Sequence, residues 1–373
     1  MQRLLTTGLA LLFVLSVADT EFGQAGRPRV DAQYEPHSMF APLPLPPGTE
    51  AEAYISNAAF PVDMAWVPGT SKIFYTEKNS GRVRVAVGRN VLDQPCVDLD
   101  VESSGERGAL GIVLHPRFKD NHFLYVYYTN ADPLENRVTR FVVQRNRCTS
   151  PNHVVTGITT TSGYHNGGQL EFVRGKLFVA TGETHNPALA QDTDNRLGKI
   201  LRLNDNGTIP DGNPFSTATG RNPVWSYGHR NPFGLAHKPG TGRIYSSENG
   251  PQCDDELNRI RPGRNYGWGP GYDCGTAGVG TNPTGPLVRW SSIIVPTDLW
   301  WYRGRLKAMS GSLYMGDFAN GNLHRFIMNR EGTRVREDRI VLSDSDGITD
   351  VSKGPGGWLY YMTPSRIVRI VRS

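Results

Sequence analysis

Apolar residues from about position 60 onward gather in short runs of strand length, separated by polar turns rich in Pro, Gly and Asn. The same order recurs six times: an apolar run, a turn and a second apolar run, which predicts a β-hairpin. These stretches begin at Met64, Ala109, Gly167, Pro232, Ser310 and Ile348. Repeats at roughly 50-residue spacing are typical of propellers and solenoids, because one small sheet cannot bury its faces without neighbours. We therefore predict an all-β chain folded as a six-bladed β-propeller.

Composition and length agree with this prediction. No stretch keeps a 3.6-residue apolar period between helix caps, and the 42 Gly and 26 Pro residues are many for a helical protein. We expect one propeller domain over residues 51–373, because the repeats are evenly spread, although the length alone also allows two domains. Between the fourth and fifth hairpins we expect a long insertion around 270–302. Its aromatic side chains either stack on sugar rings or pack between blades; they are Trp290, Trp300, Trp301 and Tyr302.

The first 25 residues (1–25) indicate an export signal rather than part of the fold. Arg3 precedes the apolar run from Leu4 to Ala18, and small residues follow it. The run is short for a membrane span, so we expect no stable span after cleavage, with an uncleaved anchor as the alternative. Residues 26–50 contain PLPLPP at 42–47 and are expected to form a Pro-rich linker. A periplasmic or secreted location follows from the signal.

The four cysteines form an even set in a chain that is expected to be exported, which favours disulfides over thiol chemistry. Three pairings are possible. Proximity in the sequence favours Cys253–Cys274, which leaves Cys96–Cys148 to join neighbouring blades. No Cys or His spacing indicates a zinc site.

The net charge of +5 and the sequence pI near 9.0 are mild for this length. Arg residues are scattered over turns, without an aromatic-interleaved stripe or a nucleic-acid motif, so we expect no nucleic-acid partner. A solvated surface accounts for this charge. A weak attraction to anionic envelope surfaces or sugars is the functional alternative.

Residues able to do chemistry concentrate in three stretches beside the third and fourth hairpins. In 164–169, His165 stands beside paired glycines, and Glu183 could orient its imidazole if the strands bring them together; a structural His is the alternative. The stretch 227–234 sets Arg230 beside Asn231, which suits a ligand with carbonyl or carboxylate oxygens, or is a charged turn. The stretch 247–258 joins a Gly-Pro turn at Gly250 to carboxylates, the hard oxygen ligands that calcium prefers, or is an acidic solvated turn.

Together with the repeats, these stretches resemble the soluble quinoprotein sugar dehydrogenases, the glucose/sorbosone dehydrogenase family of six-bladed propellers that use pyrroloquinoline quinone (PQQ) and calcium. The resemblance runs from about residue 55 to the C-terminus. The matching segments are GRVRV (81–85), GERGALGIVLHPRF (105–118), HNGGQL (165–170), LFVATGE (177–183), GKILRL (198–203), GHRNPFGLA (228–236), ENGP (248–251), DELN (255–258) and NYGW (265–268).

The resemblance implies a role for each matching residue. His165 would be the general base that takes the proton from the anomeric hydroxyl of the sugar while hydride passes to the quinone, and Glu183 would support it. Arg230 and Asn231 would face the quinone, where the cation stabilises developing negative charge. His165, Glu183 and Arg230 are thus the predicted catalytic residues, with an aldose as substrate and an electron acceptor in the envelope as partner.

The same resemblance implies the cofactor and metal ligands. The carbonyls of Gly250 and Pro251 would bind the calcium that acts as a Lewis acid on the quinone. Glu256 and Tyr266 match positions of a neighbouring calcium site in the family. Glu106 falls where the glucose enzyme has a sugar-contacting Gln, and we group it with Arg230 and Asn231 in the cofactor-binding set.

The chain departs from the family pattern at the cations that hold the carboxylates of the cofactor. In the glucose enzymes these are a Lys on the fifth blade and two Arg on the sixth, whereas segments 316–321 and 347–349 of this chain contain no cation. Each missing charge-assisted hydrogen bond weakens binding by roughly 1.5–3 kcal/mol. Arg303, Arg305, Lys307 or Lys353 could replace them from a loop.

Two interpretations follow. The first is an exported PQQ-dependent aldose dehydrogenase, which the matching catalytic residues favour. The second is a propeller of the same family that lacks the quinone and serves as a carbohydrate- or protein-binding module, which the missing cations favour.

Overall fold

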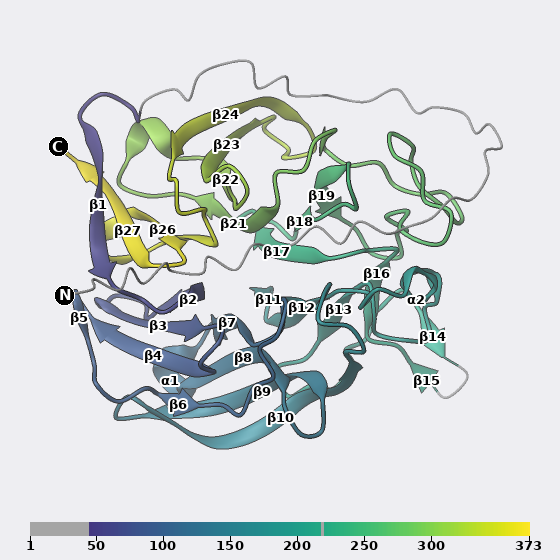
Figure 1. The fold of residues 1–373 in the computed structure, drawn as a ribbon, viewed down its shortest axis with the longest axis horizontal. Helices are drawn as coiled ribbons and strands as arrows, with labels where there is room; N and C mark the ends of the chain where they lie inside the picture. The colour runs from purple at the N-terminus through teal and green to yellow at the C-terminus, as the bar shows by residue number, and fades with distance from the viewer. Residues whose placement is uncertain (1–44, 218–219) are drawn as a thin grey trace, which may run out of the picture.

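The computed structural model describes residues 45–217 and 220–373. The predicted export signal and most of the predicted linker therefore lie outside the described residues. Six sheets, each built from antiparallel strands, stand around a ring (Figure 1). The predicted six-bladed, all-β propeller is confirmed. Within the described residues, no helix has the length and apolar character that crossing a membrane requires.

The first three blades follow one another along the chain. Blade one contains β2 (Pro61–Trp66), β3 (Lys72–Glu77), β4 (Arg82–Val87) and a split outer strand, β5 (Asn90–Val91) and β6 (Val97–Asp98). Blade two contains β7 (Ala109–Leu114), β8 (Phe123–Asn130), β9 (Glu135–Gln144) and β10 (Arg147–Thr159). Blade three contains β11 (Gly167–Val173), β12 (Lys176–Thr181), β13 (Lys199–Leu203) and β16 (Val224–Tyr227). Short elements between them are α1 (Phe118–Asn121), α2 (Pro187–Gln191), β14 (Ser216–Thr217) and β15 (Gly220–Arg221).

The remaining blades complete the ring. Blade four contains β17 (Pro232–His237), β18 (Ile244–Glu248), β19 (Asp255–Ile260) and β20 (Val288–Trp290). Blade five contains β21 (Pro296–Tyr302), β22 (Ser312–Asp317), β23 (Asn322–Met328) and β24 (Val335–Ser343). Blade six contains β25 (Asp350–Lys353), β26 (Leu359–Thr363), β27 (Arg366–Arg372) and, from the start of the chain, β1 (Thr49–Ser56). Two 3₁₀ turns, η1 (Lys307–Met309) and η2 (Pro355–Gly357), lie in blades five and six.

The ring closes where β1 pairs antiparallel with β27, so that the outer strand of blade six comes from the opposite end of the chain. Thr49 pairs with Arg372. Thr49 and Glu50, which the sequence places at the end of the linker, thus belong to this blade. Because the first and last segments share one sheet, neither can leave without opening the ring.

Blade five begins earlier than its sequence pattern suggests. The hairpin that starts near Ser310 is formed by the second and third strands of the blade, and the first strand is β21, inside the predicted 270–302 insertion. The aromatic run there breaks the polar/apolar alternation because β21 is covered on both faces. Trp290, Trp301 and Tyr302 are buried in the cores between blades. Their alternative role of stacking on sugars is therefore wrong.

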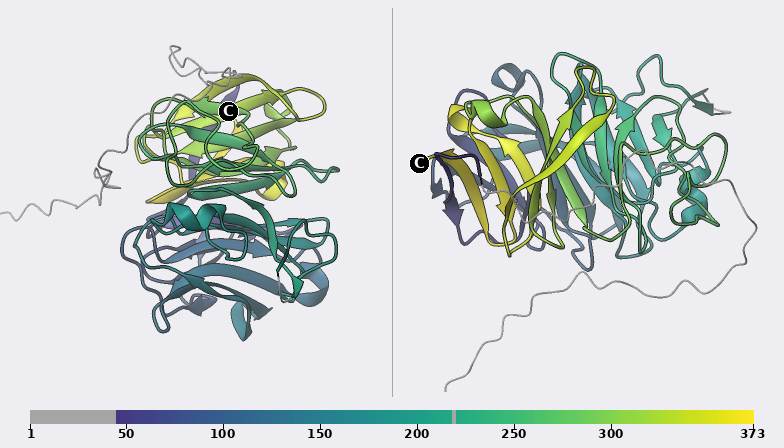
Figure 2. Two further views of the ribbon diagram at one scale, coloured as in Figure 1. Left: turned by 90° about the vertical axis from the view of Figure 1, so that its right-hand side faces the viewer. Right: turned by 90° about the horizontal axis from the view of Figure 1, so that it is seen from above.

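The antiparallel order gives the ring two distinct ends, seen edge-on in Figure 2. Turns between the first and second strands of each blade lie at one end, which we call the 1–2 end. Turns between the second and third strands lie at the other, which we call the 2–3 end. The described chain enters at the 1–2 end, since Thr49 is paired with the last residue of β27.

Both predicted disulfides are present. Cys96–Cys148 links blade one to blade two across a sequence separation of 52 residues, and Cys253–Cys274 closes a loop of blade four with a separation of 21. Cys253 also adjoins the Gly-Pro turn, because a Cβ on Gly250 would lie 1.9 Å from the Cys253 carbonyl oxygen. The shorter disulfide therefore restrains the backbone beside the predicted calcium ligands.

Removing the shorter disulfide by Cys253→Ser and Cys274→Ser is expected to destabilise the protein by about 3 kcal/mol, because the unfolded chain regains the entropy of an open loop. Removing Cys96 and Cys148 instead is expected to cost about 4 kcal/mol, since that loop is longer. Urea unfolding of both variants, compared with the unaltered chain, measures the two losses. Equal midpoints for all three proteins would contradict the prediction.

Candidate functional site

His165 and Glu183 meet at the 2–3 end of blade three. His165 lies in the turn that leads into β11, and Glu183 is the second residue after the end of β12. The imidazole Nδ1 is 2.6 Å from Glu183 Oε1. The two loops approach so closely that a Cβ on Gly182 would lie 2.0 Å from the His165 carbonyl oxygen, which requires glycine there. The contact anticipated from the sequence is therefore present, and because Nδ1 faces the carboxylate, proton transfer to His165 would fall to Nε2.

Glu183 is almost completely buried, with 1% of its surface exposed. Its second carboxylate oxygen accepts a hydrogen bond from the backbone N–H of Asn186. Burial raises the pKa of Glu183 to about 7, with the positive charge of Arg230 acting in the opposite direction. The carboxyl group beside His165 thus changes its protonation near neutral pH.

Glu106 joins three blades at this end. It precedes β7, and its Oε2 accepts hydrogen bonds from the His165 backbone N–H at 2.8 Å and from Asn231 Nδ2 at 3.1 Å. The Asn231 side-chain oxygen in turn accepts from the Gly167 backbone N–H at 3.0 Å. The structure therefore brings His165, Glu106 and Asn231 into one hydrogen-bonded group.

A second His–Glu pair lies behind Arg230 and Asn231. Glu248 Oε1 accepts the backbone N–H groups of both residues, at 2.6 and 3.1 Å, and Glu248 Oε2 lies 2.8 Å from His229 Nδ1. The other ring nitrogen of His229 is 2.9 Å from the Ser226 hydroxyl. Ser226 and His229 are fully buried, so this group positions the turn and cannot act on a substrate.

The sequence interpretation missed this pair, although a signal was present. His165 and Glu183 are 18 residues apart, and His229 and Glu248 are 19 apart. In both blades the His precedes the first strand and the Glu ends or follows the second. The shared spacing identifies Glu248 as the counterpart of Glu183.

Glu248→Gln is expected to destabilise the protein by about 1–3 kcal/mol, because the Gln amide nitrogen cannot accept the hydrogen bonds that the buried carboxylate accepts. Urea unfolding measures the loss. Glu171→Gln is the matched control, since Glu171 pairs with the half-exposed His237 at 3.3 Å. An effect no larger than that of the control would show that Glu248 does not hold the Arg230–Asn231 turn.

Arg230 has a buried N–H group that makes no hydrogen bond to the described residues. Its Nη1 donates to the Asn249 carbonyl at 3.1 Å, and its guanidinium lies 5.3 Å from the Trp268 ring centroid. Its Nε is buried without a hydrogen-bond partner among the described residues, as is the hydroxyl of Thr184. Buried donors without partners are costly, so this arrangement suits a ligand that carries oxygen acceptors.

The predicted calcium ligands divide into two places. Gly250 and Pro251 directly follow Asn249, which contacts Arg230, and their carbonyls accept no hydrogen bond from the described residues. Glu256 is the cross-strand neighbour of Glu248, and burial raises its pKa to about 8. The Glu256 carboxylate accepts a hydrogen bond from Asn258 Nδ2 at 3.0 Å and forms an ion pair with Arg289 Nη2 at 3.5 Å.

Tyr266 packs its ring on His229, with centroids 4.6 Å apart, and its hydroxyl donates to the Arg259 carbonyl at 2.5 Å. The Tyr266 side chain is therefore part of the support behind the Arg230–Asn231 turn. A calcium role for Glu256 and Tyr266 stays a prediction.

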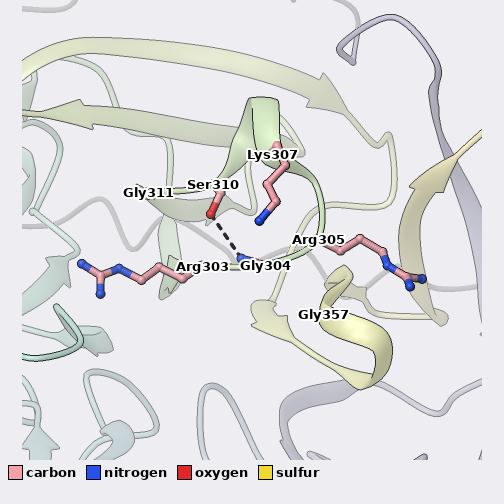
Figure 3. A pocket seen from close by; sticks show the side chains of 7 residues that line it. All are labelled: Arg303, Gly304, Arg305, Lys307, Ser310, Gly311 and Gly357. Carbon is pink, nitrogen blue, oxygen red and sulfur yellow. Dashed lines mark hydrogen bonds between the residues drawn. The ribbon is translucent and has the colours of Figure 1, made fainter.

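The four cations suggested as replacements for the family's carboxylate clamp lie at the wrong end. Arg303, Arg305 and Lys307 are in the turn between β21 and β22, and Lys353 ends β25, so all four occupy the 1–2 end. Figure 3 shows the first three lining a pocket at this turn. That suggestion is wrong, because all four lie at the opposite end of the ring from the His165 turn.

Lys78 is a cation at the 2–3 end that the sequence interpretation missed. It directly follows β3 and is buried, and its ammonium donates to the Ser103 carbonyl at 3.1 Å. Burial lowers the pKa of Lys78 to about 8, with the Glu106 charge acting in the opposite direction. A positive charge on blade one therefore interacts with the same Glu106 that holds His165 and Asn231.

Three aspartates meet near the centre of the ring, and the sequence interpretation did not single them out. Asp63, Asp298 and Asp350 are buried on the first strands of blades one, five and six, with carboxylate oxygens within 4.8 Å of one another. Asp63 accepts from the Ile112 backbone N–H at 2.6 Å, and Asp350 accepts from that of Met64 at 2.9 Å. We call this group the carboxyl triad. In the sequence, the feature that these three residues share is an Asp at the third position of an apolar segment; the segments are PVDMAW, PTDLWWY and ITDVSK.

The chain is thus a six-bladed propeller that carries a His–Glu pair and an adjacent Arg–Asn pair at one end. The family model "Glucose / Sorbosone dehydrogenase" matches residues 58–372. The chain belongs to this family.

The chain is similar to several known proteins. It is 30% identical to an uncharacterised protein of Synechocystis, over 99% of this chain and 96% of the relative. It is 32% identical to an aldose sugar dehydrogenase of Escherichia coli, over 71% and 76% of the two chains. The solved PQQ-bound aldose sugar dehydrogenase of Streptomyces coelicolor has a TM-score of 0.75 and 28% identity, over 87% of this chain and 99% of that chain.

Proposed function

We propose that this protein is an exported aldose dehydrogenase that oxidises a sugar at its anomeric carbon, with PQQ as hydride acceptor, calcium as its metal and an envelope electron acceptor as partner. The observation that carries the proposal is the hydrogen-bonded group at the 2–3 end, in which Glu183 pairs with His165 and Glu106 links His165 to Asn231. The family membership and the PQQ-bound relative support it.

The residues present fit the quinone and the metal. The buried Nε of Arg230 and the hydroxyl of Thr184 lack partners among the described residues and suit the oxygens of a quinone. The Gly250 and Pro251 carbonyls suit calcium, which prefers hard oxygen ligands. Lys78 offers a second positive charge at this end, although blades five and six supply none in segments 316–321 and 347–349.

When bound, the quinone would supply the hydride acceptor and calcium the Lewis acid. The chain itself would provide proton transfer and charge. His165 would accept the proton of the anomeric hydroxyl at Nε2, while Glu183 at Nδ1 stabilises the resulting imidazolium. Arg230, held through its backbone by Glu248, would offset negative charge that develops nearby.

The second candidate is a quinone-free propeller that binds carbohydrate or protein. It is favoured by the missing cations of blades five and six, since a tricarboxylate ligand gains much of its affinity from charge-assisted hydrogen bonds. Both candidates are compatible with calcium at the Gly-Pro turn.

Titration of the purified protein with PQQ in the presence of calcium separates the two candidates. We expect a change in cofactor absorbance at micromolar concentrations, followed by reduction of an artificial acceptor when aldoses are added. Arg230→Met should weaken PQQ binding by at least about tenfold, because it removes a charge-assisted contact of roughly 1.5–3 kcal/mol. Arg303→Gln at the 1–2 end is the matched control and should bind normally. Absent binding and absent acceptor reduction would leave the binding module as the function.

A further inference from the structure

The charges of the propeller are segregated between its two ends, which the modest net charge conceals. The six turns between first and second strands carry seven exposed Lys and Arg residues and one exposed acid, Asp120. The basic residues are Arg117, Lys119, Arg174, Arg303, Arg305, Lys307 and Lys353. None of them forms an ion pair with another described residue. The turns between third and fourth strands lie at the same end and add exposed bases, among them Arg145, Arg264, Arg330 and Arg334, and the exposed acids Asp211, Asp273 and Glu331. Unpaired charge gathered on one face creates a positive potential there.

The 2–3 end has the opposite character. Its turns carry three exposed acids, Asp132, Asp192 and Asp194, against one exposed base, Arg196. The scattered Arg residues of the sequence thus form a directional pattern once each turn is assigned to an end.

The densest part of the basic end is an open pocket of about 550 Å³ in blade five. In Figure 3, Arg303 and Arg305 extend to opposite sides of Gly304, with Lys307 between them. Tyr302 fixes this turn, because its hydroxyl donates to the Gly357 carbonyl at 2.6 Å and accepts from the Leu306 backbone N–H at 3.1 Å. The three cations are therefore presented by a rigid turn.

The position of the chain's entry supplies a second observation. Residues 45–48 lead into β1, which begins at the 1–2 end beside Arg372. The 44 residues that precede the described chain include the apolar run from Leu4 to Ala18, so this run is tethered to the basic end. Where the run is retained, a surface that holds it is connected to the ring through the basic end.

We propose that the 1–2 end is a docking face for an anionic lipid surface, with the 2–3 end and its His165 site directed away from that surface. A broad basic end on a rigid ring matches an extended array of negative head groups, and each basic residue near such a membrane contributes about 1 kcal/mol. The attraction acts within a Debye length of about 10 Å at 0.1 M salt. The inference is independent of the proposed enzymatic function.

Co-sedimentation of the full chain with lipid vesicles tests this proposal. Vesicles of phosphatidylcholine with 30 mol% phosphatidylglycerol, about one anionic lipid in three, are compared with phosphatidylcholine alone, which reports any binding by the apolar run without charge. We expect stronger binding to the anionic vesicles at 50 mM NaCl and its loss at 500 mM, because salt screens the attraction.

The variant with Arg303→Gln, Arg305→Gln and Lys307→Gln should bind anionic vesicles roughly a hundredfold more weakly, at about a factor of five for each charge. The matched control, Arg82→Gln with Arg196→Gln, removes cations near the 2–3 end and should bind normally. Thermal unfolding checks that both variants fold. Equal binding to the two vesicle types, or equal loss in both variants, would overturn the proposal.

Binding to polygalacturonate but not to anionic vesicles would also overturn it and would indicate an acidic polysaccharide as the ligand.

Discussion

His165→Ala is expected to lower sugar-dependent reduction of an electron acceptor by roughly a thousandfold, within the 10²–10⁴ range that a positioned general base contributes. Binding of PQQ and calcium should change little, because the contacts of Arg230 and of the Gly250 carbonyl come from blade four. Turnover is measured with saturating aldose and acceptor, and cofactor affinity by absorbance titration of the same variant. A parallel loss of affinity would indicate that His165 holds the cofactor and is not the base.

The neighbouring His185 provides the discriminating control. Its ring lies 4.2 Å from that of His165, stacks on Tyr164 and is exposed. His185→Ala should retain most of the activity. If His185→Ala loses turnover and His165→Ala does not, the base is His185. Glu183→Gln should lower turnover less than His165→Ala, since the imidazole remains while its carboxylate partner is lost.

The fold was predictable because each blade repeats the same local pattern. Apolar strands separated by Gly- and Pro-rich turns recur six times, and only stacked blades bury both faces of such strands. The contact between His165 and Glu183 was also accessible, because the two residues border strands that must pair within one hairpin. Local pairing fixes which residues of a hairpin are adjacent even before the arrangement of the blades is known.

Assignments that depend on the order of strands within a blade were not predictable. Taking the Ser310 run as a first strand places Arg303, Arg305 and Lys307 before the blade, at the 2–3 end. In the structure this run is the second strand, so the same turn lies at the 1–2 end. Miscounting by one strand assigns a turn to the opposite end of the ring, because neighbouring strands are antiparallel. The strand that the pattern missed is β21, whose aromatic run lacks polar/apolar alternation.

Contacts between distant blades were equally inaccessible to sequence patterns. Glu106 reaches Asn231 across 125 residues, and Lys78 interacts with Glu106 from the preceding blade. The carboxyl triad joins Asp63 to Asp350 across almost the whole chain. Such contacts arise only when the ring closes, and a single Asp in an apolar strand does not reveal which other carboxylates it will face.

The carboxyl triad is expected to make the stability of the propeller fall as pH rises from about 4 to 7. Burial is the main cause that raises the pKa of all three carboxyls, to about 7 for Asp298, and the neighbouring carboxylates also raise those of Asp63 and Asp350. The folded state therefore binds protons more tightly than the unfolded state, whose Asp residues have a pKa near 3.9. Stability from this source is fully present below the unfolded pKa and is lost by the time pH exceeds the folded pKa.

Asp298→Asn should remove much of this pH dependence, because the amide stays neutral while filling nearly the same volume. The expected gain over the unaltered chain is small at pH 4 and on the order of a few kcal/mol at pH 8. Urea unfolding across this range, with a chelator present so that no cation neutralises the triad, measures the difference. Asp132→Asn, at an exposed turn of the 2–3 end, is the matched control and should run parallel to the unaltered chain. If the free energy of unfolding of Asp298→Asn shows the same pH dependence as that of the unaltered chain, the triad does not carry the unfavourable charge that its burial implies.

A gain in stability that disappears when calcium replaces the chelator would instead mean that a cation can occupy the centre of the ring and offset the repulsion there.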